Sequence, residues 1–161
     1  MDFSSVLSLL QVAFPRFTDR ALEALSAARE QAAARHHAHV TPEHLLLALA
    51  VIRPGPGSIT LQRLGVDLSQ SIGQLQALLP APAREADADY QSFSSAMERL
   101  LVEAEAQSTA LGHRYVGTEH LVLGLLRCQD CPASVYLLQL GITVEQFRTE
   151  ALRLLAGKPP S

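Results

Sequence analysis

Apolar residues recur along most of the chain at the three-to-four-residue spacing of amphipathic helices. From Thr18 to about Arg35 the apolar positions are mainly alanines together with Leu22 and Leu25, a composition that favours close packing against neighbouring helices. Thr18 is a good N-cap residue, and Phe17 before it is placed to form a hydrophobic staple with Leu22. The sequence therefore predicts a first long helix that begins just after Thr18.

Three more helices are predicted before residue 80. The second begins at Thr41-Pro42, because threonine caps a helix and proline is tolerated at its first position. The third runs over residues 59–64 and ends at Gly65, a residue typical of helix C-termini. The fourth opens at Asp67 and has apolar residues about one turn apart. No alternating strand pattern of useful length is present, so an all-α fold is predicted.

The second half of the chain repeats the first. Sliding the sequence by 76 residues aligns two segments without a gap, and about twenty positions match. The matches include Phe17 with Phe93, His37 with His113, the run Glu43-His44-Leu45 with Glu119-His120-Leu121, and Gly65 with Gly141. The sequence thus predicts two tandem four-helix repeats, residues 16–79 and 93–157, in one compact pseudo-twofold domain. A linker over residues 80–92 joins them, and an amphipathic helix over residues 1–15 precedes them.

Composition and charge are those of a soluble globular domain. Of the 161 residues, 48% are hydrophobic and 18% are charged, and the formal net charge is -3. No stripe of lysine and arginine is present, which argues against nucleic acid as the main partner. The apolar runs are too short to span a bilayer, so no membrane partner is expected. Two cysteines without a secretion signal predict a cytoplasmic location.

The most specific motif of the chain lies in the second repeat. Residues 111–126 read Leu-Gly-His-Arg-Tyr-Val-Gly-Thr-Glu-His-Leu-Val-Leu-Gly-Leu-Leu, and residues 16–21 read Arg-Phe-Thr-Asp-Arg-Ala. Together with the tandem repeat, these segments resemble the Clp N-terminal repeat domain of the Clp ATPases, essentially over residues 16–157. The corresponding run of the first repeat, residues 40–49, is more similar to ClpB and ClpA than to ClpC.

This resemblance implies protein recognition without catalysis. Domains of the family receive adaptor or client proteins for a Clp unfoldase, and ClpC-like members bind phosphorylated arginine side chains. The chain has no Gly-x-x-x-x-Gly-Lys-Ser/Thr phosphate loop, and its glycine-proline turn at residues 54–57 lacks the lysine. We therefore expect no ATP hydrolysis, no catalytic residue and no cofactor. The expected partners are Clp ATPase or protease subunits and adaptor or client proteins, for a free-standing repeat protein or the N-terminal part of a longer one.

The chemistry of phosphoarginine suits two sets of residues. Its guanidinium requires a carboxylate, and its phosphate requires hydroxyl groups and the free N–H groups of helix starts. By resemblance, the expected binding residues are Ser94, Thr118 and Glu119 in the second repeat, with Ser94 and Thr118 as helix caps, and Thr18 and Glu43 in the first. Pro42 removes one N–H and one hydroxyl from the first set, so the second site is expected to be stronger. An acid in a first helical turn also stabilises the helix dipole without any ligand, and this structural role stays open for both glutamates.

Histidines and cysteines suggest further alternatives. His44 and His120 are interpreted as packed, hydrogen-bonded residues rather than metal ligands, and the cluster around His37 as a solvated loop, so no metal site is expected. Cys128 and Cys131 form a single C-x-x-C that follows a helical segment, unlike a thioredoxin motif. A small thiol oxidoreductase is therefore the weakest alternative function. A structural accessory subunit that braces a Clp protease assembly is the stronger one.

Overall fold

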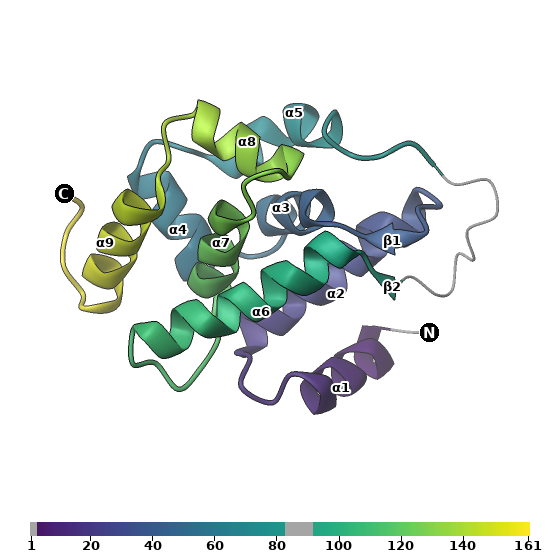
Figure 1. Cartoon of the computed structure of the whole chain (residues 1–161), viewed down its shortest axis with the longest axis horizontal. Helices are drawn as coiled ribbons and strands as arrows, with labels where there is room; N and C mark the ends of the chain where they lie inside the picture. Colours follow the sequence, from purple (N-terminus) through teal and green to yellow (C-terminus); the bar gives the residue numbers. More distant parts are fainter. Residues whose placement is uncertain (1–2, 83–91) are drawn as a thin grey trace.

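The predicted helices of both repeats form in the order that the sequence indicates (Figure 1). The computed structural model describes residues 3–82 and 92–161. The N-terminal helix is α1 (Phe3–Ala13), and the first repeat contains α2 (Asp19–Ala34), α3 (Pro42–Val51), α4 (Pro56–Arg63), the 3-10 helix η1 (Leu68–Ser71) and α5 (Ile72–Gln76). The second repeat contains α6 (Ser95–Ala110), α7 (Thr118–Arg127), α8 (Pro132–Gln139) and α9 (Val144–Leu155). The all-α fold is confirmed.

Side-chain caps explain where the long helices begin. Thr18 accepts the backbone N–H of Ala21 at 3.2 Å and caps α2, as the sequence predicts. Ser94 accepts the backbone N–H of Met97 at 3.1 Å and caps α6 in the same way. Each bond satisfies one of the backbone donors that a helix start leaves unpaired. The two longest helices of the domain therefore start at equivalent positions of the two repeats.

Two predicted boundaries differ from the structure. Helix α4 begins at Pro56 rather than at Ile59, because proline supplies a preset φ and needs no hydrogen-bond partner at a first helical position. The fourth element of the first repeat does open at Asp67, whose carboxylate accepts the N–H of Ser69 at 3.1 Å. That element is nevertheless a 3-10 turn followed by five residues of α-helix, and not one continuous helix.

Two very short parallel pairings accompany the helices of the all-α fold. Strand β1 (His39–Val40) pairs in parallel with β2 (Ser92–Phe93), and an isolated parallel bridge joins Phe17 to Val116. In both places the chain just before the second helix of one repeat runs beside the start of the first helix of the other. A strand of two residues cannot show a period of two, so its sequence carries no signal.

Helices α3 and α7 lie in the centre of the molecule. Figure 1 shows α2 and α6 on one side of them and α5 and α8 on the other. Helix α3 is buried on nearly every side over residues 42–49, and α7 over residues 118–126. Gly124 lets α7 approach α6 closely, because a Cβ there would lie 2.7 Å from the carbonyl oxygen of Leu100. The two helices that carry the predicted glutamates are thus held by the core itself.

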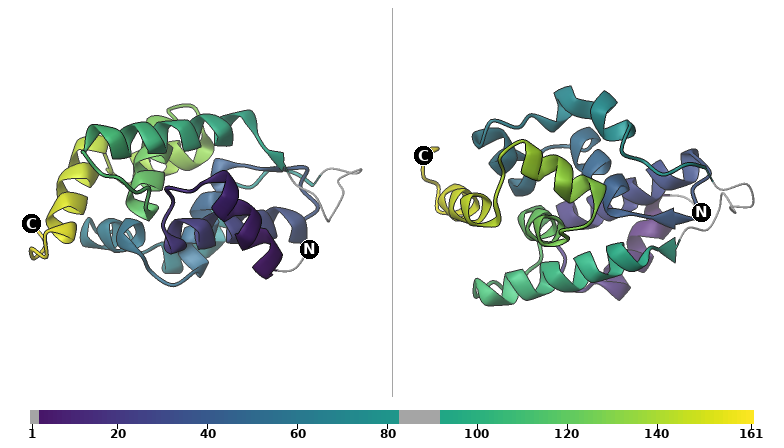
Figure 2. Two further views of the ribbon diagram at one scale, coloured as in Figure 1. Left: turned by 90° about the horizontal axis from the view of Figure 1, so that it is seen from below. Right: turned by 45° about the horizontal axis from the view of Figure 1, so that its top comes forward.

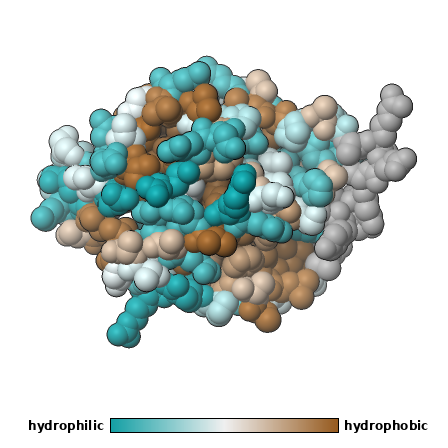
Figure 3. Space-filling model, viewed as in Figure 1, coloured by the Kyte–Doolittle hydropathy of each residue, from teal (hydrophilic) through white to brown (hydrophobic). Residues whose placement is uncertain are grey.

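The remaining segments lie around this core. Helix α1 packs against α2, buries Val6 and exposes Leu9 and Val12. Figure 3 shows a hydrophobic area at the lower edge of the molecule. The C-terminal segment lies at the opposite end of the molecule from the N-terminus (Figure 2). The predicted linker over residues 80–92 falls largely outside the described residues. Within the part that is described, no single helix is long and apolar enough to cross a membrane, although two bent pairs, α3 with α4 and α7 with α8, meet that criterion together.

Candidate functional site

Three helix N-termini converge at each of two related places between the repeats. At the first, named junction A, the starts of α2, α4 and α7 meet, and at the second, named junction B, those of α6, α8 and α3. The N–H of Thr18 donates to the carbonyl of Val116 just ahead of α7, and the N–H of Ser94 donates to the carbonyl of Val40 just ahead of α3, both at 3.0 Å. Helix starts carry free N–H groups and a partial positive charge. Each junction therefore favours an anionic group.

Different side chains hold the third helix start at the two junctions. At junction A, the hydroxyl oxygen of Thr118 accepts the N–H of Gly57 at the start of α4, at 2.8 Å. At junction B, a carboxylate oxygen of Glu43 accepts the N–H of Ala133 at the start of α8, at 3.1 Å. Pro42, the counterpart of Thr118, has no hydroxyl group, and the neighbouring glutamate takes over the bond. The prediction that Thr118 caps its own helix is wrong, because Gly117 occupies the N-cap position of α7.

Glu119 is left without a hydrogen bond by this arrangement. Its side chain is 1% exposed, and neither carboxylate oxygen has a hydrogen-bond partner among the residues that the structure describes. The nearest histidine atom, His120 Nδ1 at 3.5 Å, already accepts the N–H of Gly117 and has no proton to donate. The carboxylate lies over Gly117, where a Cβ atom would overlap with it. Burial raises the pKa of Glu119 to about 7, against the opposing effect of the N–H groups of Glu119 and His120.

Glu43 is also buried, but its carboxylate has a hydrogen-bond partner. Burial raises its pKa as well, and the N–H of Ala133 is the main group that opposes this shift. The residue equivalent to Gly117 is Thr41, which has a side chain of its own and caps α3. The two glutamates are therefore equivalent in sequence and different in state. One is bonded to the other repeat, and the other is buried without a partner.

The histidines beside these glutamates have a structural role. His44 Nδ1 accepts the N–H of Thr41 at 2.9 Å, so its proton resides on Nε2 and is donated to His37 Nδ1 at 2.7 Å. Burial lowers the pKa of His44 and of His120 to about 4, so both rings are neutral at pH 7. The packed role predicted for these two residues is confirmed, whereas the solvated loop is wrong for His37, which is 3% exposed. The same bonds recur in the second repeat, where His120 accepts from Gly117 and donates to His113.

A cavity of about 240 Å³ opens at junction B. It is lined by Thr41, Pro42, Glu43, Ser94, Ala96, Arg99, Asp130, Cys131 and Pro132. The structure thus brings Glu43 of the first repeat together with Ser94 of the second, whereas Thr18 of the first repeat lies beside the start of α7, the helix that carries Thr118 and Glu119. The predicted binding residues are grouped across the repeats rather than within them.

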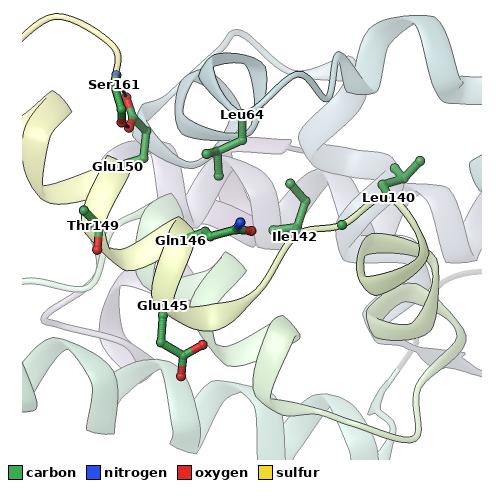
Figure 4. Close-up of a pocket in the computed structure, with 9 residues that line it drawn as sticks. Leu64, Leu140, Ile142, Glu145, Gln146, Thr149, Glu150 and Ser161 are labelled. Atoms are coloured by element: carbon green, nitrogen blue, oxygen red, sulfur yellow. Dashed lines mark hydrogen bonds between the residues drawn. The ribbon is translucent and has the colours of Figure 1, made fainter.

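A larger cavity lies elsewhere in the described structure. It measures about 490 Å³ between α4 and α9 and contains none of the predicted binding residues (Figure 4). Its buried carboxylate, Glu150, accepts hydrogen bonds from the N–H and hydroxyl of Ser161 and lies 3.7 Å from Arg63. The buried carboxylate of this cavity is therefore engaged by the chain itself.

The two cysteines of the C-x-x-C form a disulfide with each other. Cys128 follows the last turn of α7, and Cys131 is the N-cap residue of α8. Asp130 lies between them, and one of its oxygens is within 4.8 Å of both sulfur atoms. With the sulfurs bonded to each other, these residues offer no thiolate to a metal ion.

Both repeats lie within the match to a known domain family. The protein-family model of the Clp repeat (R) N-terminal domain matches residues 16–159. The chain belongs to this family. The resemblance seen in residues 16–21 and 111–126 is therefore confirmed, and the match includes both repeats and both junctions.

Curated relatives of this Clp N-terminal domain are much longer proteins. Two relatives are each 30% identical to the chain over 144 residues. They are the chaperone protein ClpB of Oceanobacillus iheyensis and the negative regulator of genetic competence ClpC/MecB of Bacillus subtilis. Each match covers 89% of this chain and 18% of the relative. The chain thus spans under a fifth of the length of these relatives.

Solved structures of Clp N-terminal domains share the fold. The N-domain of ClpV from Vibrio cholerae superposes with a TM-score of 0.73 at 21% identity, and the match covers 100% of this chain and 93% of that one. The N-terminal domain of ClpD from Arabidopsis thaliana gives a TM-score of 0.68 at 23% identity, covering 89% and 96%. The helical Clp N-domain fold is therefore the fold of this chain.

Proposed function

We propose that this domain is a non-enzymatic recognition module of a Clp unfoldase system, and that it binds adaptor or client proteins through a phosphorylated arginine side chain. The observation that supports the proposal is the pairing, at each junction, of three helix starts with a glutamate carboxylate. A phosphoarginine presents an anionic phosphate beside a planar, cationic guanidinium. The helix starts can bind the phosphate, and the carboxylate can bind the guanidinium. Family membership supports the general role in recognition, and the chemistry of the junctions supports the ligand.

The hydroxyl groups of the junctions each keep a proton that a phosphate oxygen could accept. The oxygen of Thr18 accepts the N–H of Ala21, and that of Thr118 accepts the N–H of Gly57, but each hydroxyl still has its own proton to donate. Ser94 is in the same situation at junction B. A hydrogen bond to a phosphate is charge-assisted and stronger than one between neutral groups.

Junction A is the stronger site in this proposal. Glu119 gives up no hydrogen bond when it turns toward a guanidinium, whereas Glu43 must release the N–H of Ala133. A buried carboxylate without a partner is costly, so pairing it with a cation relieves an existing penalty. The expectation that Glu119 contributes more than Glu43 is therefore retained, with Thr18 rather than Ser94 as the neighbouring cap.

Binding at junction A should release a proton near neutral pH. The pKa of Glu119 is raised to about 7 by burial, and an adjacent guanidinium lowers a carboxyl pKa. Part of the protein population therefore loses a proton on binding between pH 6 and pH 7. Affinity should rise with pH over this interval and level off above it.

Titration calorimetry with free phosphoarginine tests the proposal, with arginine and inorganic phosphate as separate control ligands. A charge-assisted hydrogen bond is worth about 1.5–3 kcal/mol, so Glu119→Ala should weaken binding by about tenfold or more. Glu119→Gln keeps the shape and removes the charge, and should weaken binding nearly as much. Glu43→Ala should have the smaller effect.

Far-ultraviolet circular dichroism of each variant checks that the fold is intact. The recognition of phosphoarginine is contradicted if the wild type gives no heat with it, or if inorganic phosphate binds equally well. The assignment to junction A is contradicted if folded Glu43→Ala loses more affinity than folded Glu119→Ala. Heats measured in two buffers of different ionisation enthalpy would show the proton release directly.

A further inference from the structure

The disulfide lies in the wall between two cavities. Cys131 is 5% exposed and lines the junction B cavity beside Glu43. Cys128 is half-buried and lines a neighbouring cavity of about 440 Å³, which also contains Arg99 and Arg127. Arg99 belongs to both cavities. One cysteine thus lines the candidate binding site, and the other lines a separate cavity.

The bond ties the end of α7 to the start of α8. Cys131 is the N-cap residue of α8 and makes no side-chain cap hydrogen bond among the described residues. Pro132 follows it and has no N–H, so Ala133 carries the first free N–H of the helix, which Glu43 accepts at 3.1 Å. The position of this N–H, and with it the position of the Glu43 carboxylate, depends on where the disulfide holds the helix start.

Junction A has no such bond. The residues equivalent to Cys128 and Cys131 are Ile52 and Gly55. The start of α4 is held instead by the hydroxyl of Thr118, which accepts the N–H of Gly57 at 2.8 Å. The molecule therefore contains a matched control for any effect of the disulfide on junction B.

We propose that the Cys128–Cys131 disulfide is a redox-modification site, that a dithiol reduces it, and that its redox state sets the anion affinity of junction B. The part that concerns affinity rests on the proposed function. The part that concerns the modification and its local structural effect stands on the position of the disulfide alone.

The reaction is thiol–disulfide exchange. A thiolate of the dithiol attacks Sγ of Cys128, the more exposed cysteine, forms a mixed disulfide and releases Cys131 as a thiolate at the start of α8. The second thiol of the dithiol then attacks the sulfur atom that the dithiol contributed to the mixed disulfide. This step closes the disulfide of the oxidised dithiol and releases Cys128. The dithiol is oxidised to a disulfide by two electrons, and both cysteines end as thiols or thiolates. A thiolate at a helix N-terminus is stabilised by the partial positive charge there.

Reduction weakens junction B for two physical reasons. Without the covalent tie, the N–H of Ala133 is held only by Glu43 and by packing. In addition, the freed sulfur of Cys131 brings a negative charge to the helix start that an anionic ligand needs. A single charge at a helix N-terminus changes affinity by about threefold, and the affinity of junction B should fall by at least this factor.

Amide hydrogen exchange tests the local effect without any ligand. Samples of the oxidised wild type, the wild type reduced by dithiothreitol and the double variant Cys128→Ala/Cys131→Ala are compared at residue resolution, with thiol alkylation and mass measurement to count the reduced cysteines. The Ala133 amide should exchange about tenfold faster in the reduced protein and in the variant, and the Gly57 amide should not change. The proposal is overturned if dithiothreitol leaves the native disulfide intact, if Ala133 exchange stays constant, or if both amides respond equally.

Calorimetry with phosphoarginine on the Glu119→Ala background isolates junction B. The affinity should fall at least about threefold on reduction, with a smaller fall in the double cysteine variant because that variant removes the tie without adding a charge. Equal affinity in oxidised and reduced protein overturns the effect on binding. If phosphoarginine binds to no form of the protein, the proposed function fails, and the exchange data alone decide whether the disulfide is a modification site that controls the start of α8.

Discussion

Junctions A and B are built from equivalent helix starts and differ in the side chain that holds the third one. Where the second repeat has Gly117 and Thr118, the first has Thr41 and Pro42. The hydroxyl of Thr118 binds the start of α4 at junction A, so Glu119 stays unpaired, while at junction B the missing hydroxyl is replaced by Glu43. Two differences ahead of the Glu-His pair that the repeats share are enough to turn a carboxylate without a partner into one that holds a helix start.

The fourth elements of the repeats differ for a similar local reason. Thr143 and Gln146 form a reciprocal capping box at the start of α9, which continues for 12 residues. In the first repeat, Asp67 binds the N–H two residues ahead and starts a 3-10 turn. Phe147 anchors α9 in the core at 0% exposure, and its counterpart is Ser71. One repeat therefore closes with a long anchored helix and the other with two short turns.

The largest effect should come from removing that anchor. Phe147→Ala deletes a fully buried aromatic ring and should lower the free energy of unfolding by about 3–5 kcal/mol. Ser71→Ala at the equivalent position removes one weak bond to a backbone carbonyl and should change it by less than about 0.5 kcal/mol. Urea denaturation of both variants measures the difference. Similar losses would show that the two closing elements are equally important.

The pH dependence of stability should separate the two glutamates. Since the pKa of Glu119 is raised to about 7 in the folded protein, its contribution falls as pH rises from about 4.5 through 7. Between pH 5 and pH 8 the wild type should therefore lose up to roughly 3 kcal/mol more stability than Glu119→Gln. Glu43→Gln should show a smaller difference, because the N–H of Ala133 opposes the shift there.

Denaturation at both pH values gives these differences, and the histidines, present in all three proteins, cancel in the comparison. Parallel pH profiles of the wild type and Glu119→Gln would contradict a buried, unpaired carboxylate at junction A.

At one equivalent helix position, the second repeat should be destabilised by adding a methyl group and the first by removing one. A Cβ at Gly124 would lie 2.7 Å from the carbonyl oxygen of Leu100, and backbone cannot give way easily. Gly124→Ala should therefore destabilise the domain by about 1–3 kcal/mol. At the equivalent position, Ala48 is fully buried, and Ala48→Gly should cost about 1 kcal/mol through lost packing and greater chain flexibility. Thermal denaturation tests both; a stabilising Gly124→Ala would mean that α6 and α7 are less tightly packed.

The smallest effect concerns the ends of α2 and α6. Both helices finish with the same pair of backbone bonds around a residue of positive φ, which is Gly112 at 74° in the second repeat and His36 at 56° in the first. A left-handed conformation strains a residue that has a Cβ, and His36 is exposed. His36→Gly should stabilise the domain by about 1 kcal/mol, and Gly112→Ala should destabilise it by a similar amount. A melting temperature that falls in His36→Gly would refute this explanation.

Much of the fold follows from local sequence signals. Thr18 and Ser94 mark the starts of α2 and α6, Thr41 marks α3, and Gly65 and Gly141 lie just past the ends of α4 and α8. Such signals act within one helical turn, so they can be recognised without knowledge of the rest of the chain. The fixed spacing between the repeats adds the pseudo-twofold arrangement.

The candidate site was only partly predictable. The sequence singles out Glu43 and Glu119 because each lies in the first turn of a helix. It gives no indication that Thr118 would bind the start of α4, or that Glu43 would bind the start of α8, since these partners are 61 and 90 residues away. The burial of His37 and the parallel pairing of β1 with β2 have the same origin in contacts between distant segments.

The sequence by itself determined most of the helices, the caps at Thr18, Thr41 and Ser94, the tandem repeat and the residue types at both junctions, because these depend on periodicity and on neighbours in the chain. Only the tertiary structure decided which residues face one another. Each repeat contributes the first helix to one junction and the second to the other, so each junction draws its residues from both halves of the chain. Whether a glutamate is free or bonded then depends on one backbone N–H from another helix. The position of that N–H is fixed by the packing of the whole core.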